Sequence, residues 1–191
     1  MHATRVVTFL LGAWLIGTLF VDSMVYTNLR LPELAISGAP PDAENIIKNY
    51  GPEQAPLLLH YYAGETNQYF LYRWELIELG LGLILLPCVF AATERKVIPL
   101  VMASFLLILA LAQFFVVSPE LAYRGREVAF PPGKGNVLLE ARLTKMWGMF
   151  AGTEGVLVVV GGALAGYVAS YKTRRRASRM AAIEEELAKR G

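Results

Sequence analysis

The sequence predicts an all-α membrane protein, a transmembrane four-helix bundle with two structured outer loops and a short cytoplasmic C-terminal helix. Hydrophobic residues make up 55% of the 191 residues, and the mean hydropathy is +0.43. This composition is more apolar than that of a water-soluble domain. Four segments reach the roughly 20 apolar residues that cross a ~30 Å hydrocarbon layer. Lys and Arg are concentrated at the segment ends that lie on one side of the membrane, and this asymmetry predicts the orientation of the bundle.

The predicted spans divide the chain into a membrane domain at 1–171 and a basic, amphipathic tail at 172–191. The spans cover about 6–26, 74–92, 97–117 and 147–171, and the outer loops cover 27–73 and 118–146. Arg5 before the first apolar run is typical of a signal peptide. However, the run is long enough to span, and no small-x-small cleavage site follows promptly. We therefore expect an uncleaved first helix.

The first outer loop is predicted to hold structure of its own, because connections longer than ~15 residues are usually structured or functional. Pro32 is expected to break the first helix. Asp42 is a predicted N-cap for a short helix that Gly51 ends. The aromatic-rich stretch 56–72 is expected to be helical and to lie at the membrane interface, where Tyr is favoured.

Three further signals mark the remaining elements. Pro87 removes one backbone hydrogen bond and predicts a kink in the second span. A short basic turn at 93–96 leads into the third span, which Ser118 and Pro119 are expected to end.

The basic residues near span ends all fall on one side of the predicted bundle. By the positive-inside rule that side is cytoplasmic. We therefore expect a multi-pass protein of the bacterial cytoplasmic (inner) membrane, with both termini cytoplasmic. The residues that set this orientation are Arg5, Arg95, Lys96, Lys172, Arg174, Arg175, Arg176 and Arg179.

Polar groups from all four spans are predicted at one depth. Counting 1.5 Å per residue from the cytoplasmic edges places them in the outer third of the membrane. Ionisable groups at such a depth are a functional hypothesis by default. Anions this close would repel one another, so protons or cations must neutralise some of them. The cluster consists of Asp22, Glu75, Glu78, Gln113 and Glu154, and the predicted counter-charges at the outer edge are Arg73, Arg124, Arg126, Arg142 and Lys145.

Three interpretations of this cluster stay open. Outer-loop arginines could fold onto the acids and fasten the loops to the bundle. The acids could instead form a proton or cation site that opens to the outside, or some could be solvated at the interface. Di-metal centres in four-helix bundles pair acids with histidines on the same helices. Since His2 and His60 lie outside the predicted spans, we expect no metal and no cofactor.

Other chemistries find no support in the sequence. A single cysteine, Cys88, excludes an internal disulfide. No Ser-His-Asp set, phosphate-binding glycine loop or zinc spacing occurs, so no enzyme is predicted. The basic residues form no nucleic-acid footprint with interleaved aromatics.

A glycine stripe in the fourth span predicts helix packing. Its members recur at helical spacing, and small residues let another helix backbone approach closely in lipid. Besides the bilayer, the sequence therefore predicts a membrane-protein partner on this face. The glycines are Gly148, Gly152, Gly155, Gly162 and Gly166.

Short motifs over most of the chain suggest a family. They are 14–20, then Leu57-Leu58 through Asn67, Tyr69, Phe70 and Trp74-Glu75, then Ser118-Pro119-Glu120 with Arg124-Gly125-Arg126 and Phe130, then 148–154. This pattern resembles a family of small four-span bacterial integral membrane proteins of unknown function, relatives of the eukaryotic four-span proteins linked to platinum-drug resistance. The resemblance implies four helices and no established activity. Trp147 stands where the family leads us to expect a histidine, which favours a structural role.

Two functions follow as hypotheses. The first is a non-enzymatic accessory or scaffold subunit that packs against a larger complex of the respiratory or photosynthetic kind. The alternative is a small proton- or metal-cation carrier or channel that uses the carboxylate cluster. An enzyme acting on a lipid or quinone at the outer leaflet lacks a recognisable nucleophile or base.

Overall fold

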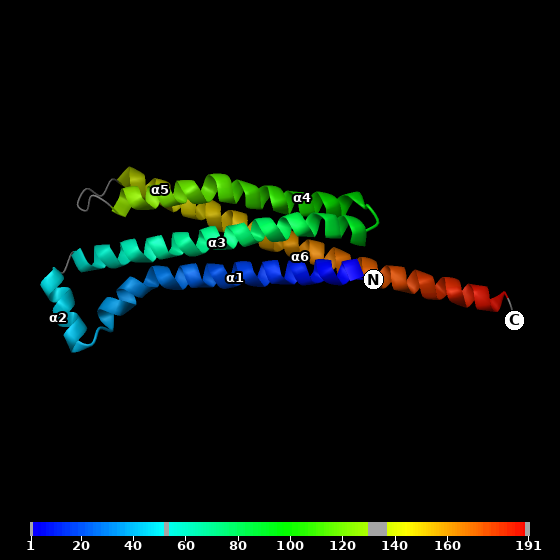
Figure 1. The fold of residues 1–191 in the computed structure, drawn as a ribbon, viewed down its shortest axis with the longest axis horizontal. Coiled ribbons are helices and arrows are strands. Elements are labelled where there is room, and N and C mark those ends of the chain that lie inside the picture. The colour runs from blue at the N-terminus through cyan, green and yellow to red at the C-terminus, as the bar shows by residue number, and fades with distance from the viewer. Residues whose placement is uncertain (1, 52–53, 130–136, 190–191) are drawn as a thin grey trace.

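A computed structural model describes residues 2–51, 54–129 and 137–189, and these residues form helices and no strand. The all-α prediction is confirmed. Figure 1 shows long helices running side by side, with α2 turned across one end and α6 extending beyond the other. The elements are α1 (His2–Ser37), α2 (Pro41–Tyr50), α3 (Gln54–Ala92), α4 (Val97–Ala112), the π-helix η1 (Gln113–Val117), α5 (Ser118–Ala129) and α6 (Val137–Ala188).

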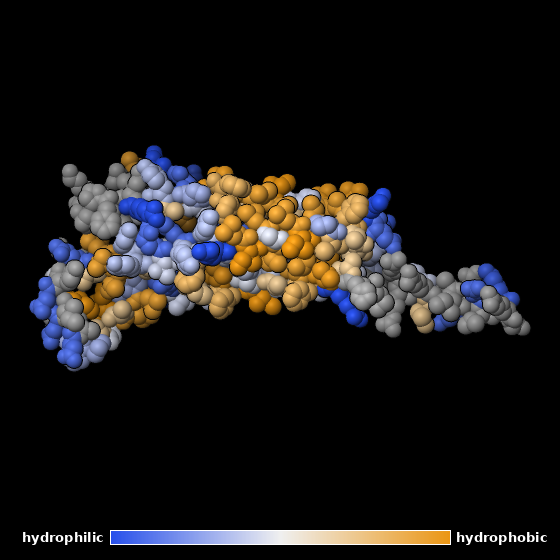
Figure 2. Space-filling model, viewed as in Figure 1, coloured by the Kyte–Doolittle hydropathy of each residue, from blue (hydrophilic) through white to orange (hydrophobic). Residues whose placement is uncertain are grey.

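Four helices are long and apolar enough to cross a membrane, which makes this a multi-pass membrane protein. Their bounds are Ala3–Ser37, Gln54–Ala92, Val97–Arg126 and Ala141–Tyr171. On the face seen in Figure 2, an apolar surface lies between the C-terminal tail and the more hydrophilic end of the bundle that carries α2. We call the end that carries α2 the outer end, after the predicted orientation. Each helix is longer than the roughly 20 residues that cross the hydrocarbon layer. The helices therefore project beyond the membrane, and much of the two predicted outer loops consists of these projections.

Three residues expected to bound helices lie inside them instead. Pro32 is within α1. Pro119 is the second residue of α5, which continues from η1 without a break; the wide π turn just before it accommodates a residue that lacks an N–H. Asp42 lies in the first turn of α2, which begins at Pro41, because proline is well suited to the first helical position.

The predicted turns are in place. Gly51 follows α2 with φ +105°, a conformation that glycine adopts without strain. Glu94 and Arg95 have φ of 53° and 66° in the turn between α3 and α4. The N-terminal end of α1 lies at the same end of the bundle as this turn (Figure 1).

The core consists of two apolar clusters with a polar layer between them. The larger cluster lies toward the 93–96 turn and includes Leu11, Leu85, Leu106 and Leu164, all at most 1% exposed. The smaller cluster lies toward the outer end and is made by Val25, Leu71, Val117, Leu121 and Phe150. On each of the four long helices a buried polar residue falls between the two clusters, so the bundle carries one polar layer at a common level along its axis; buried Asn67 of α3 lies outside this layer, beyond Leu71.

Candidate functional site

The polar layer brings together three carboxyl groups and two other polar side chains from all four spanning helices. Glu75, Glu78 and Glu154 are 2%, 0% and 3% exposed, and Gln113 and Thr18 are equally inaccessible. Four of the five residues predicted for the cluster therefore share one buried site.

Glu78 joins α3 to α1 through two hydrogen bonds. Trp14 Nε1 and Thr18 Oγ1 each donate to Glu78 Oε1 at 2.9 Å. Trp14 and Thr18 are four residues apart on α1 and so lie one above the other on one face. The second carboxyl oxygen of Glu78 has no hydrogen-bond partner among the described residues.

Glu75 and Glu154 repeat this pattern with donors from the third spanning helix. Ser118 Oγ donates to Glu75 Oε1, and Gln113 Nε2 donates to Glu154 Oε1. In both carboxyl groups Oε2 again has no partner within the described chain. Each of the three acids is thus held through one oxygen, and no hydrogen bond from the described residues reaches the other.

The π-helix explains how one helix serves two acids. Gln113 is its first residue and Ser118 directly follows it. In an α-helix, side chains five residues apart point about 140° away from each other. The wider π turn reduces this angle, so both donors face the acids. A π-bulge inserted in an α-helix is frequently found at a functional site.

Asp22 lies at the edge of the layer. It is one helical turn beyond Thr18 on α1 and is only half-buried. No hydrogen bond joins it to the described residues, in contrast to the three buried glutamates. Asp22 is therefore the most exposed carboxyl group of the predicted cluster.

Two of the predicted counter-charges bind other acids. Arg126 donates from Nε and Nη2 to the two oxygens of Glu65, at 2.7 and 2.9 Å. Arg124 donates to Glu120, four residues earlier on α5, at 2.8 Å. Both pairs lie in the outer part of the molecule, so these arginines do not fold onto the buried glutamates as expected.

The other three predicted counter-charges also lie away from the layer. The Arg73 guanidinium is 5.3 Å from the centroid of the Tyr69 ring, and Arg142 and Lys145 are exposed. Among the described residues, the buried carboxyl groups receive hydrogen bonds from neutral donors only. The prediction of an arginine-fastened cluster is corrected, because long cationic side chains near helix ends extend toward water rather than enter the apolar interior.

The chemistry of the layer favours protons over metal ions. A carboxylate buried without a cation is strongly disfavoured relative to its neutral acid. The described residues contain no group of three or more His, Cys, Asp or Glu side chains placed to hold a metal ion. The layer can therefore bind protons on the free carboxyl oxygens, with each acid fixed in place by its other oxygen.

Sequence reasoning missed the donors Trp14 and Ser118. The four-residue spacing of Trp14 and Thr18, which places both on one face of α1, could have identified Trp14 as a donor. Ser118 was interpreted as a helix end, and no sequence pattern signals the π turn that brings it inward. Trp74 was also not assigned to the site, although its indole N–H is buried without a hydrogen-bond partner in the described chain.

The predicted glycine stripe faces away from the bundle. Gly148, Gly152, Gly155, Gly162 and Gly166 are exposed, and a Cβ built on any of them would meet no atom within 4 Å. The buried glycine of α6 is Gly161, whose Cβ would lie 3.1 Å from Leu15. The stripe therefore does not pack the helices of this chain, and its surface is open to lipid or to another protein.

The fold and the polar layer define a class: a multi-pass membrane bundle of four helices with a buried carboxyl layer. No protein-family model, curated protein or solved structure matches the chain. The resemblance to the small four-span bacterial family stays a prediction.

Proposed function

We propose that this chain is a small membrane protein that binds and exchanges protons at its buried carboxyl layer. One observation carries the proposal: Glu75, Glu78 and Glu154 are each held through one oxygen by neutral donors, and the other oxygen of each has no hydrogen-bond partner among the described residues. Such a layer suits a proton carrier better than a metal-cation carrier, because no set of metal-ligating side chains converges in the described residues.

Asp22 provides the connection to the outside in this proposal. The series Trp14, Thr18 and Asp22 forms one stripe on α1 with a spacing of four residues. Glu78 accepts hydrogen bonds from the first two members, and half-buried Asp22 follows them toward the outer end. A proton taken up by Asp22 would reach Glu78 through the Thr18 hydroxyl, which can accept one proton and donate another to Glu78. A rotation of the Asp22 side chain or an intervening water would have to join Asp22 to Thr18. From the positive-inside rule we further propose that both termini lie in the cytoplasm of a bacterial cell and that the protein lies in the inner membrane of that cell.

Proton uptake by proteoliposomes tests the proposal. The wild-type protein, reconstituted with a pH-sensitive dye inside and a potassium diffusion potential, is expected to take up protons faster than empty vesicles. Glu78→Gln combined with Glu154→Gln should abolish the difference, because an amide cannot carry the exchanged proton. Glu65→Gln, in the exposed outer ion pair, is the control and should keep the wild-type rate. Unchanged uptake in the double variant, or no uptake by the wild type, would contradict the proposal.

The exposed glycine stripe favours a second candidate, a non-enzymatic subunit of a larger membrane complex. Small residues without steric obstruction allow close approach of a partner helix, and the five glycines meet no atom of this chain. Purification from native membranes in mild detergent tests this function. A stoichiometric partner is expected to co-purify, and a protein that purifies alone would exclude it.

A further inference from the structure

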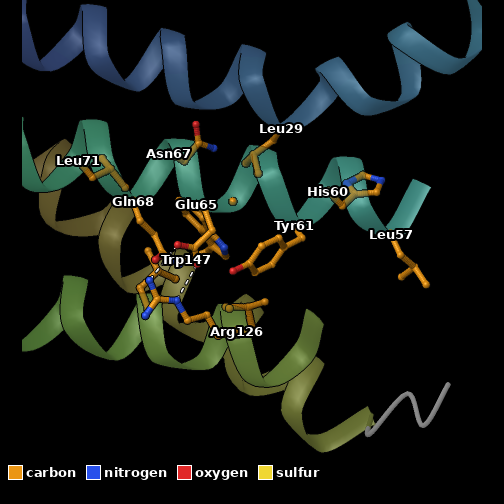
Figure 3. A pocket seen from close by; sticks show the side chains of 14 residues that line it. Leu29, Leu57, His60, Tyr61, Glu65, Asn67, Gln68, Leu71, Arg126 and Trp147 are labelled. Carbon is orange, nitrogen blue, oxygen red and sulfur yellow. Dashed lines mark hydrogen bonds and ion pairs between the residues drawn. The ribbon is translucent and has the colours of Figure 1, made fainter. Parts of the chain in front are cut away.

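A cavity of about 350 Å³ lies at the outer end of the bundle, separate from the carboxyl layer. Residues of α1, α3, α5 and α6 line it, and Figure 3 shows their side chains gathered between the helices. Ligand sites in proteins begin at about 300 Å³ and are largely apolar with a few placed polar groups. The size and position of this cavity fit such a site.

The walls are apolar and come from four helices. The cavity is lined by one leucine from each helix: Leu29 of α1, Leu71 of α3, Leu121 of α5 and Leu143 of α6. Trp147 adds an aromatic surface. Leu71 and Leu121 are almost fully buried. The interior therefore suits the apolar part of a membrane-soluble molecule, and the Trp147 ring favours a planar group.

The polar groups gather on the side formed by α3 and α5. Arg126 and Glu65 form a two-bond ion pair, and Tyr61 reaches from α3 toward α5 beside them (Figure 3). Because the two charges match each other, the pair favours an uncharged ligand over an ion. A guanidinium has five N–H groups, and Arg126 uses two of them on Glu65. The others can donate to a ligand carbonyl.

We propose that this cavity binds an uncharged, ring-headed molecule of the bilayer that carries carbonyl acceptors, the chemical class of the isoprenoid quinones. A cavity of roughly 150 Å³ accepts one benzene, so 350 Å³ accommodates a substituted ring with the start of a chain. His60 and Leu57 are exposed at the lining, which leaves an entrance at the outer end. This inference concerns binding alone and does not depend on proton exchange by the buried layer.

Two glycines of α3 provide a matched pair of variants. Gly64 lines the cavity, and a Cβ built on it meets no atom within 4 Å. Gly64→Leu therefore causes no clash at Cβ, and its side chain should occupy part of the cavity. Gly80 lies on the same helix, is outside the cavity lining and has equally open space around its Cβ position. Gly80→Leu is the control, because it makes the same glycine-to-leucine change on α3 without filling the cavity.

The test is titration of the full chain in nanodiscs of phosphatidylethanolamine and phosphatidylglycerol with a benzoquinone that bears one isoprenoid unit. Quenching of tryptophan fluorescence is the readout, since Trp147 lines the cavity. We expect saturable quenching with the wild type and with Gly80→Leu. Affinity should be about tenfold weaker with Gly64→Leu, which takes up part of the space, and a few-fold weaker with Arg126→Gln.

Three results would overturn the inference: quenching that does not saturate in the wild type, an unchanged affinity of Gly64→Leu, or equal displacement of the probe by a linear alcohol of similar size. The last would show a site for chains rather than rings. If Gly64→Leu does not fold, Leu143→Phe fills the same cavity from α6 and must weaken binding for the inference to stand.

Discussion

Glu78→Ala should destabilise the protein by about 3 kcal/mol, and Glu78→Gln by less than about 1 kcal/mol. Alanine leaves two buried donors, Trp14 N–H and Thr18 O–H, without their acceptor and opens a space in a layer that is closed to solvent. Glutamine keeps a carbonyl oxygen in the same place and differs from a neutral acid only in its amide group.

Unfolding in mixed micelles of increasing SDS content, followed by tryptophan fluorescence, measures the two free energies. Glu65→Ala is the control, because its ion pair with Arg126 is largely solvent-exposed and contributes at most about 1 kcal/mol. If Glu78→Gln proved as unstable as Glu78→Ala, the layer would need a charged carboxylate, contrary to this account.

Gly17→Ala should destabilise the bundle by about 2–3 kcal/mol, because an added methyl group overlaps a rigid ring. A Cβ on Gly17 would lie 2.6 Å from Cζ3 and 2.7 Å from Cζ2 of Trp74. The indole cannot yield without disturbing Glu75, the next residue on α3, whose carboxyl group is bonded to Ser118.

Gly12→Ala is the matched control on the same helix. A Cβ at Gly12 meets no atom within 4 Å, and the higher helix propensity of alanine is worth about 0.5–1 kcal/mol. The same unfolding measurement should therefore show the two substitutions changing stability in opposite directions. Equal stability of both variants would show that Trp74 does not pack on Gly17 as described.

The fold class and the common level of the polar residues along the bundle could be predicted from the sequence. Helix rise is constant, so counting residues from the cytoplasmic edges placed Glu78, Gln113 and Glu154 at one depth, between the two apolar clusters that the structure shows. The level of a residue along a helix depends only on its position in the chain, which explains why this alignment could be predicted without knowledge of packing.

The partners of the acids could not be predicted in this way. They depend on the rotation of each helix about its axis, and the π turn that directs Gln113 and Ser118 to the same side has no sequence signature. Opposite charge alone suggested Arg126, but its partner is Glu65 at the outer end. Charged side chains stay near water where they can. The position of Arg126 near the predicted membrane edge therefore did not reveal which acid it binds.

Proline was also an unreliable guide to helix ends. Pro32 lies within α1, and Pro119 lies in a helix that continues from η1. In both places the apolar segment continues outward as a helical projection beyond the membrane. The predicted outer loops are therefore helical over much of their described length. The short turn at Glu94 and Arg95 was predicted correctly.

Infrared spectroscopy tests most directly whether the buried carboxyl groups are uncharged acids able to exchange protons. At neutral pH the wild-type protein in lipid should show the C=O stretch of protonated carboxyl groups, shifted in D₂O. Glu78→Gln and Glu154→Gln should each remove part of this band, while Glu65→Gln should leave it unchanged. A spectrum with carboxylate bands alone, or a protonated band unaffected by both layer variants, would contradict the account.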